Sequence, residues 1–186
     1  IAKASTEIIN LSSILQLPKG TEHFMTDIHG EYEQFIHILK NGSGTVRSKI
    51  DDVFGFELSQ EDKTDLATLI YYPEEKMKLV KAAGTNMHDW YRTMLLRLIR
   101  MTRRASMKYT RSKVRKSIAG FAYIIEELVA VNESTAKEHY YEGILEAIIR
   151  TGRAKECVCA FAHTIQRLVV NHLHIVGTSM TGGPAP

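Results

Sequence analysis

Apolar positions along this chain recur every three or four residues in one segment after another, which is the spacing of amphipathic helices. The pattern predicts helices over residues 5–17, 29–42 (after an initial loop), 60–69, 73–83, 86–116, 117–131, 132–149 and 154–170. Two short runs, 21–28 and 172–177, have instead the composition of strands. We therefore expect a predominantly α-helical chain with two short strands, which pair in parallel across a long helical crossover.

Capping residues give some helix boundaries. Ser5 or Thr6 is the expected N-cap of the first helix, because both side chains accept hydrogen bonds from free backbone N–H groups. Pro73 suits the first turn of its helix. Asn132 or Ser134 is the expected cap of the helix that follows.

Size and composition indicate one domain, or a large piece of one. The chain has 186 residues, of which 44% are hydrophobic and 24% charged. No apolar run reaches the roughly 18 residues that span a bilayer, so we expect no membrane segment. The chain starts at Ile1 and stops on a loop rich in Gly and Pro after a strand, which suggests a fragment of a longer protein. Two strands alone make a weak sheet, so we expect the isolated chain to be marginally stable or prone to aggregate.

Cys157 and Cys159 are the two cysteines. Their spacing on a helix points the two thiols to different faces, which argues against a disulfide between them. We interpret them as structural thiols in a reducing, cytoplasmic setting.

Positive charge is concentrated between Trp90 and Ile125, a stretch with ten basic residues and no acid. Apolar residues alternate with them at helical spacing, so one interpretation is an amphipathic helix whose basic outer face pairs with acids elsewhere. The alternative is an anion- or nucleic-acid-binding module over residues 92–116. In that case an anion site would include Arg97, Arg100, Arg103 and Arg104. Nucleic acid is the least favoured of these partners.

The stretch FMTDIHGE, residues 24–31, carries the sharpest chemical signal. Asp27 and His29 end a predicted strand, and Gly30 allows the backbone to turn sharply there. A turn can bring the carboxylate and the imidazole to one point, where they would suit Mn²⁺, Fe²⁺ or Zn²⁺. The alternative is that Asp27 is only a helix cap and His29 a surface residue. His172 and His174 share one face of the last strand, and we interpret them as strand residues rather than ligands.

The segment TEHFMTDIHGEYEQFIHIL resembles the first motif of the calcineurin-like metallophosphoesterases: a strand, D-x-H-G, then an amphipathic helix. Residues 5–55, LATLIYYPEEKM and HLHIVG are similar to the amino-terminal part of the bacterial class III fructose-1,6-bisphosphatases of that superfamily. The resemblance covers essentially the whole chain. It implies an α/β parent fold, a metallophosphoesterase sandwich with a large helical insertion. Residues 1–47 would begin that domain, 48–171 would be the insertion, and 172–186 the second strand and a truncated motif loop.

The resemblance also implies a site. Asp27 and His29 match the first two metal ligands of the family, and the strand HLHIVG would lead into a second motif, G-D-I-Y-D-R-G-P. Here Thr178 stands in place of the Asp that bridges two metal ions, Thr181 in place of the second Asp, and Gly182 in place of a phosphate-binding Arg. A Thr hydroxyl is a poor replacement for a bridging carboxylate. We therefore expect this chain alone to be inactive.

For the longer parent protein, the resemblance implies hydrolysis of fructose 1,6-bisphosphate to fructose 6-phosphate and phosphate in gluconeogenesis. The reaction would use two divalent ions, Mn²⁺ foremost, that polarise the phosphoryl group and activate water. The substrate would be a sugar bisphosphate, the location the cytoplasm, and an oligomer stays open. Two other functions also stay open: a metallophosphoesterase with another phosphoester substrate, and the anion-binding helical module described above.

The departure at residues 178–182 has a specific explanation. If Asp-Ile-Tyr-Asp-Arg is encoded by GAC-ATC-TAT-GAC-AGG, reading one base late gives Thr-Ser-Met-Thr-Gly, which is the sequence found. We hypothesise that the second motif is read out of frame over these residues, with the frame restored by an added base.

Overall fold

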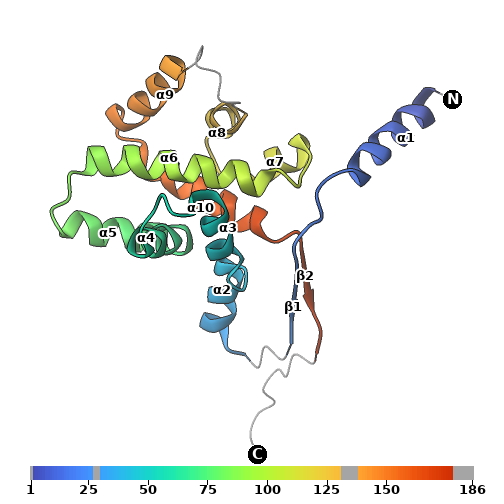
Figure 1. Cartoon of the computed structure of the whole chain (residues 1–186), viewed down its shortest axis with the longest axis horizontal. Coiled ribbons are helices and arrows are strands. Elements are labelled where there is room, and N and C mark those ends of the chain that lie inside the picture. Colours follow the sequence, from blue (N-terminus) through green and yellow to red (C-terminus); the bar gives the residue numbers. More distant parts are fainter. Residues whose placement is uncertain (1, 27–29, 131–137, 178–186) are drawn as a thin grey trace, which may run out of the picture.

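The computed structural model describes residues 2–26, 30–130 and 138–177. Most helices gather into one body, while a two-stranded sheet and the first helix lie to one side of it (Figure 1). The helices are α1 (Ala2–Leu15), α2 (Tyr32–Asn41), α3 (Thr45–Phe54), α4 (Gln60–Tyr71), α5 (Pro73–Ala82), α6 (Met87–Ser106), α7 (Arg111–Ser117), α8 (Ala122–Val129), α9 (Glu138–Arg150) and α10 (Ala154–Val169). The strands are β1 (Glu22–Met25) and β2 (His172–Ile175). The expectation of a mainly helical chain with two short strands is confirmed.

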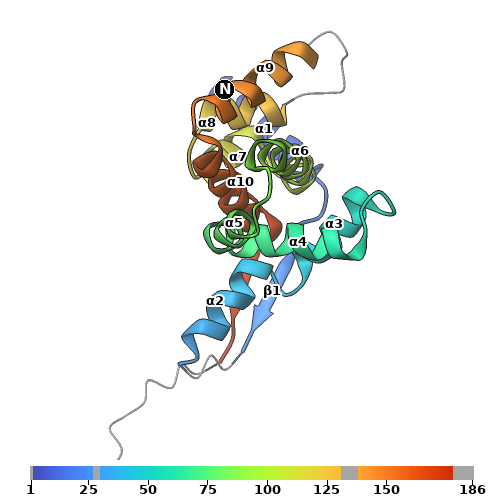
Figure 2. The ribbon, with the colours of Figure 1, turned by 90° about the vertical axis from the view of Figure 1, so that its left-hand side faces the viewer.

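The two strands pair in parallel, as expected, with Glu22 opposite His172 and Met25 opposite Ile175. The ladder continues one step further, since the N–H of Val176 donates to the carbonyl of Met25 at 2.8 Å. Both strands are shorter than the apolar runs that predicted them. They run side by side away from the helical body, beside α2 (Figure 2).

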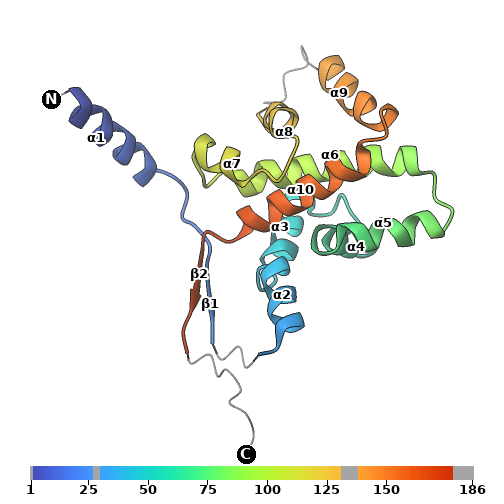
Figure 3. The same ribbon diagram turned by 180° about the vertical axis from the view of Figure 1, so that it is seen from behind.

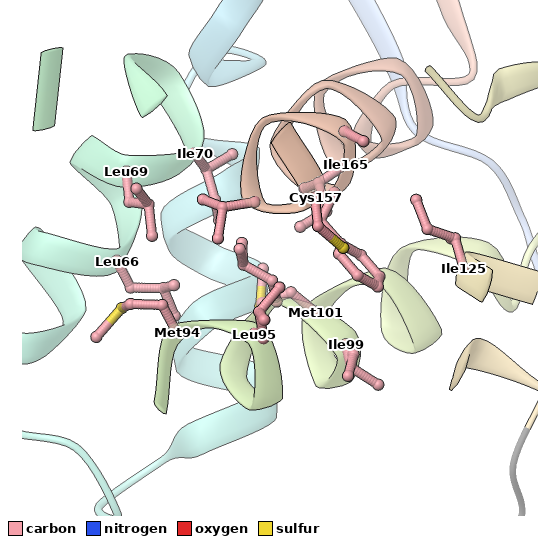
Figure 4. Close-up of a cluster of buried hydrophobic side chains, with 14 of the residues drawn as sticks. Leu66, Leu69, Ile70, Met94, Leu95, Ile99, Met101, Ile125, Cys157 and Ile165 are labelled. Atoms are coloured by element: carbon pink, nitrogen blue, oxygen red, sulfur yellow. The ribbon is translucent and has the colours of Figure 1, made fainter. Parts of the chain in front are cut away.

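The core lies where α10 packs across α6, with α3, α4 and α5 on one side and α8 and α9 on the other (Figure 3). Figure 4 shows the side chains that fill it: Leu66, Leu69 and Ile70 of α4, Met94, Leu95, Ile99 and Met101 of α6, Ile125 of α8, and Cys157 and Ile165 of α10. α10 contributes most because both flanks of this helix are covered, and Phe161 at its centre is fully buried. The helical block therefore has a closed core of its own, independent of the sheet.

The single helix expected over residues 86–116 is wrong, because the chain breaks between α6 and α7. Lys108 turns inward there, and its ammonium nitrogen donates to Thr21 Oγ1 at 3.0 Å and to the carbonyl of Val169 at 2.9 Å. The hydroxyl of Thr110 then caps α7 by accepting from the N–H of Lys113 at 3.3 Å. The Lys108 side chain is thus held by two distant acceptors, while the local Thr110 cap satisfies a backbone N–H that a continuous helix would have bonded to a carbonyl.

Some expected boundaries shift. The N-cap at Ser5 or Thr6 is wrong: α1 starts at Ala2, and the Thr6 hydroxyl donates to the Ala2 carbonyl at 3.0 Å. Pro73 does occupy the first turn of α5. Asn132 and Ser134 lie outside the described residues.

Two other expected boundaries do not coincide with the ends of helices: the domain division after residue 47 and the helix over residues 117–131. The expected division of the chain between residues 47 and 48 falls inside α3, which runs from Thr45 to Phe54, and the division itself stays a prediction. The helix expected over residues 117–131 is confined to α8, because Phe121 before it has a left-handed backbone with φ 54°.

Candidate functional site

The D-x-H-G motif lies between a strand and a helix, as its sequence predicts. β1 ends at Met25 and α2 begins at Tyr32, whose N–H donates to the carbonyl of Gly30 at 2.9 Å. Gly30 has φ +76°, a left-handed conformation that glycine adopts without strain, so the sharp turn expected there is present. Asp27 and His29 themselves lie outside the described residues.

The second motif follows the neighbouring strand. Because β1 and β2 are parallel, their carboxyl ends lie next to each other at one end of the sheet, and the chain leaves both strands there. The carboxyl ends of parallel strands are where ligand sites of α/β proteins are built. Thr178, Thr181 and Gly182 follow β2 and lie outside the described residues.

One face of the sheet is occupied by interacting side chains. The ring of His174 stacks on Phe24, with centroids 4.5 Å apart and planes 13° from parallel, and its Nε2 lies 3.5 Å from a carboxylate oxygen of Glu22. His172 shares this face, its ring centroid 6.3 Å from that of His174. The contacts give His174 a role in packing β1 against β2, in line with the interpretation of both histidines as strand residues.

A cavity of about 460 Å³ lies between the other face of the sheet, α2 and the end of α10. Its walls combine apolar residues, among them Ile36, Leu39 and Leu173, with several polar ones. Each polar residue already has a partner: His23 binds the Ser43 hydroxyl, Lys40 lies over the Tyr72 ring, Gln166 donates to the Ile70 carbonyl, Arg167 to the Ser117 carbonyl, and Asn171 accepts from the Thr21 N–H. The cavity thus has no converging set of free polar groups.

Metal ligands do not gather elsewhere in the described part of the chain. Over residues 2–26, 30–130 and 138–177 no three His, Cys, Asp or Glu side chains lie close enough to hold an ion together.

Within the same ranges, no helix is both long and apolar enough to cross a membrane.

The four arginines considered as an anion site are engaged within the chain. Three of them face carboxylates: Arg97 lies 3.0 Å from Asp62, Arg100 2.7 Å from Glu57, and Arg104 3.3 Å from Asp52. Arg103 donates to the carbonyl of Leu128 at 2.8 Å. Hydrogen bonds from Ser59 and then Arg97 lower the pKa of Asp62, and the bond from Arg100 lowers the pKa of Glu57. This arrangement favours the amphipathic-helix interpretation, with the acids supplied by α3, α4 and the loop between them.

Lys108 is one of the ten basic residues between Trp90 and Ile125, yet it is only 9% exposed. In the described part of the chain its ammonium contacts two neutral oxygens and no carboxylate. Burial, then the charges of Lys49 and Arg104, lower its pKa from 10.5 to about 8.

The cysteines behave as expected. Both are free, Cys157 buried and Cys159 partly so. Burial raises the pKa of the Cys157 thiol to about 12 and that of Cys159 to about 11, so neither is a thiolate nucleophile near neutral pH.

Comparison with known sequences identifies the family. A family model described as "Firmicute fructose-1,6-bisphosphatase" matches residues 1–186. The chain belongs to this family. A fructose-1,6-bisphosphatase class 3 of Clostridium botulinum (strain Hall) is 56% identical over 186 residues, which are 99% of this chain and 28% of that protein. The enzyme of the same name from Clostridium acetobutylicum is 54% identical over the same shares of both chains.

Membership of the fructose-1,6-bisphosphatase family confirms the resemblance based on residues 5–55, LATLIYYPEEKM and HLHIVG. The chain spans about 28% of the length of the curated relatives that it matches. No solved structure matches it. The roles of Asp27 and His29, and the replacements at Thr178, Thr181 and Gly182, stay predictions.

Proposed function

We propose that this chain supplies the first metal-binding motif and the helical insertion of a class III fructose-1,6-bisphosphatase. The observation that best supports this is the parallel pairing of β1 and β2. Each strand precedes one of the two motifs, and the pairing puts their carboxyl ends side by side. In the complete enzyme the two strands would belong to the sheets of a metallophosphoesterase sandwich. Residues 1–47 and 172–186 would contribute to the sandwich and 48–171 would form the insertion.

The donor set of this chain does not fit a two-metal centre. Asp27 and His29 offer one carboxylate and one imidazole, and Thr178 offers a neutral hydroxyl where the family has a bridging Asp. A bridging carboxylate supplies charge to both ions, which a hydroxyl does not. We therefore expect no phosphatase turnover from these residues alone, and we assign them no catalytic step.

The substrate and metal follow from the family. We propose fructose 1,6-bisphosphate as the substrate of the complete enzyme, with Mn²⁺ as its divalent ion, in the cytoplasm, where the free thiols of Cys157 and Cys159 would stay reduced. A nucleic-acid partner is not needed to explain the basic helix, because its arginines are paired within the chain.

Metal binding by the chain itself tests the assigned ligands. The free Mn²⁺ signal in electron paramagnetic resonance should be nearly unchanged by the natural chain. The variant Thr178→Asp should bind Mn²⁺ more tightly, because the third ligand adds a second carboxylate, and Asp27→Asn should remove that gain. A gain that survives Asp27→Asn would show that the metal binds elsewhere.

The activity is tested in a fusion in which this chain replaces the aligned segment of the Clostridium botulinum relative. With Thr178, Thr181 and Gly182 in place, the fusion should release no phosphate from fructose 1,6-bisphosphate with Mn²⁺. With Thr178→Asp, Thr181→Asp and Gly182→Arg together, it should release phosphate. Failure of the restored fusion, or turnover by the unrestored one, would contradict the proposal. Turnover of other phosphomonoesters alone would point to a different substrate.

The gene sequence tests the origin of the replacement. A base lost before codon 178 and one regained near the codons for Gly182 and Gly183 would support an out-of-frame second motif. Codons that do not yield Asp-Ile-Tyr-Asp-Arg in the shifted frame would refute it.

A further inference from the structure

Helix α1 is exposed along its whole length. Every residue from Ala2 to Leu15 is exposed to solvent. Figures 1 and 3 show this helix projecting away from the helical body, joined to β1 by residues 16–21. Isolated helices of this length are only marginally stable in water. A helix that packs on nothing therefore needs another source of stability.

The residues of α1 nevertheless have the pattern of a packed helix. Ala4, Ile8, Leu11 and Leu15 follow one another at intervals of four, three and four residues, so they form one seam along the helix. Ile8 is 65% exposed, Leu11 52% and Leu15 81%. Only Lys3 and Glu7 are charged among the 14 residues of the helix. A continuous apolar seam with so few charges is typical of a helix that is covered in its working state.

The sheet that follows α1 lacks neighbours as well. It consists of β1 and β2 only in the described residues, so each strand has an outer edge of unpaired backbone groups. Phe24 is 63% exposed, Ile175 54% and Val176 57%. By contrast, the faces of α4, α6 and α10 that meet in the core are closed. Apolar side chains are also exposed elsewhere, at Phe56, Leu79 and Met107 among others, but α1 and the sheet carry several of them close together in sequence.

Two kinds of partner could cover the seam: a second copy of this chain, or more of the same polypeptide. The seam has four positions over 14 residues, whereas a self-sustaining coiled coil needs roughly three to four heptads. A pair of α1 helices is therefore too short to hold two copies together. The clostridial relatives are several times longer, with 28% of their length represented here, so they contain ample chain to form a groove.

We propose that the α1 seam, Ala4, Ile8, Leu11 and Leu15, docks into an apolar groove formed by the part of the class III fructose-1,6-bisphosphatase polypeptide that these 186 residues do not include. The inference rests on the proposed function, because it takes that polypeptide as the occupant. Docking would fix the segment that leads into β1 and so the start of the strand before Asp27. α1 is then an anchor that holds the first motif against the rest of the enzyme.

Hydrogen exchange tests the docking without reference to activity. In the isolated chain the amides of α1 should exchange rapidly. In the full-length Clostridium botulinum relative the aligned peptide should exchange slower by roughly tenfold or more, because the helix is packed. Equal exchange in the two proteins would overturn the proposal. So would a dimer of the isolated chain, seen in sedimentation, in which α1 becomes protected.

Paired variants in the restored fusion locate the contact. Ile8→Gln with Leu11→Gln keeps helix propensity but removes the seam, and should lower the melting temperature and the protection of α1. Thr6→Gln with Ser13→Gln changes the opposite face and should alter neither. Equal effects of the two pairs would refute the seam. If protection is present but the fusion releases no phosphate, docking stands and the proposed activity fails.

Discussion

The buried ammonium of Lys108 should make the stability of this chain depend on pH in the alkaline range. Its nitrogen has two neutral acceptors, Thr21 Oγ1 at 3.0 Å and the Val169 carbonyl at 2.9 Å, and its pKa is lowered from 10.5 to about 8. Between these values the folded chain has released the proton that the unfolded chain still holds. The unfolded state then binds more protons at this site, so the contribution of Lys108 to the free energy of unfolding rises with pH.

The size of the effect follows from the two pKa values. A difference of about 2.5 units at 1.36 kcal/mol per unit corresponds to roughly 3 kcal/mol. This stability is fully present above pH 10.5 and is lost as the pH falls through about 8. Burial raises the pKa of Tyr109 from 10.0 to about 12, which makes the free energy of unfolding fall above about pH 10, but this contribution cancels when chains that differ only at Lys108 are compared.

Lys108→Met isolates the contribution, since Met keeps an unbranched chain but does not titrate. The free energy of unfolding should be measured in urea by circular dichroism at several pH values from 7 to 10.5. The value for the natural chain minus that for Lys108→Met should rise across this range by roughly 3 kcal/mol. Lys113→Met, at an exposed lysine of α7, is the matched control and should show no such rise. A flat or falling difference for Lys108→Met would refute the reasoning.

Three further predictions concern packing, ion pairs and thiols. Phe161→Ala in the core should cost about 3–5 kcal/mol of unfolding free energy, whereas Phe56→Ala, at a fully exposed ring, should cost less than about 0.5 kcal/mol; equal losses in urea unfolding would contradict the packing. Arg100→Gln should cost less than about 1 kcal/mol, because the Arg100–Glu57 pair is exposed, and the loss should shrink in 1 M salt if charge is its cause. At pH 7.5 a thiol reagent should label Cys159 slowly and Cys157 more slowly still, while both react at once in denaturant; rapid labelling of the folded chain would show that these thiols are not held as described.

Much of this fold was predictable because the signals are local. The apolar spacing of residues 154–170 and the proline at position 73 depend on neighbours in sequence, and the corresponding helices are present. The parallel pairing of the strands was also predictable, because a long helical segment between two strands is the usual parallel crossover. These features need no knowledge of distant contacts.

The break between α6 and α7 was not predictable in the same way. It depends on hydrogen bonds from Lys108 to Thr21 and Val169, which are 87 and 61 residues away in sequence. The partners of the arginines were equally hidden, since the Arg100–Glu57 pair joins residues 43 apart. A pattern of charges predicts an exposed face, but not which acids lie opposite it.

The site was predictable only in part. The strand, the turn at Gly30 and the start of α2 follow from local sequence, and they frame Asp27 and His29. The metal roles of these two residues came from the family resemblance, because D-x-H is too short a pattern to assign chemistry alone. That Thr178 replaces an Asp can be seen in the sequence only when the family motif is known.

The pairing of β1 with β2 has a consequence for how the chain folds. Thr21 and Asn171, bonded at 2.8 Å where the strands begin, are 150 residues apart. Closing a flexible loop of that length costs roughly 4 kcal/mol of chain entropy, more than two four-residue strands can be expected to offset. The helical block must therefore form first and bring the strand ends together. A substitution deep in the α6–α10 core would then slow or prevent the pairing of β1 with β2, although the substituted residue contacts neither strand.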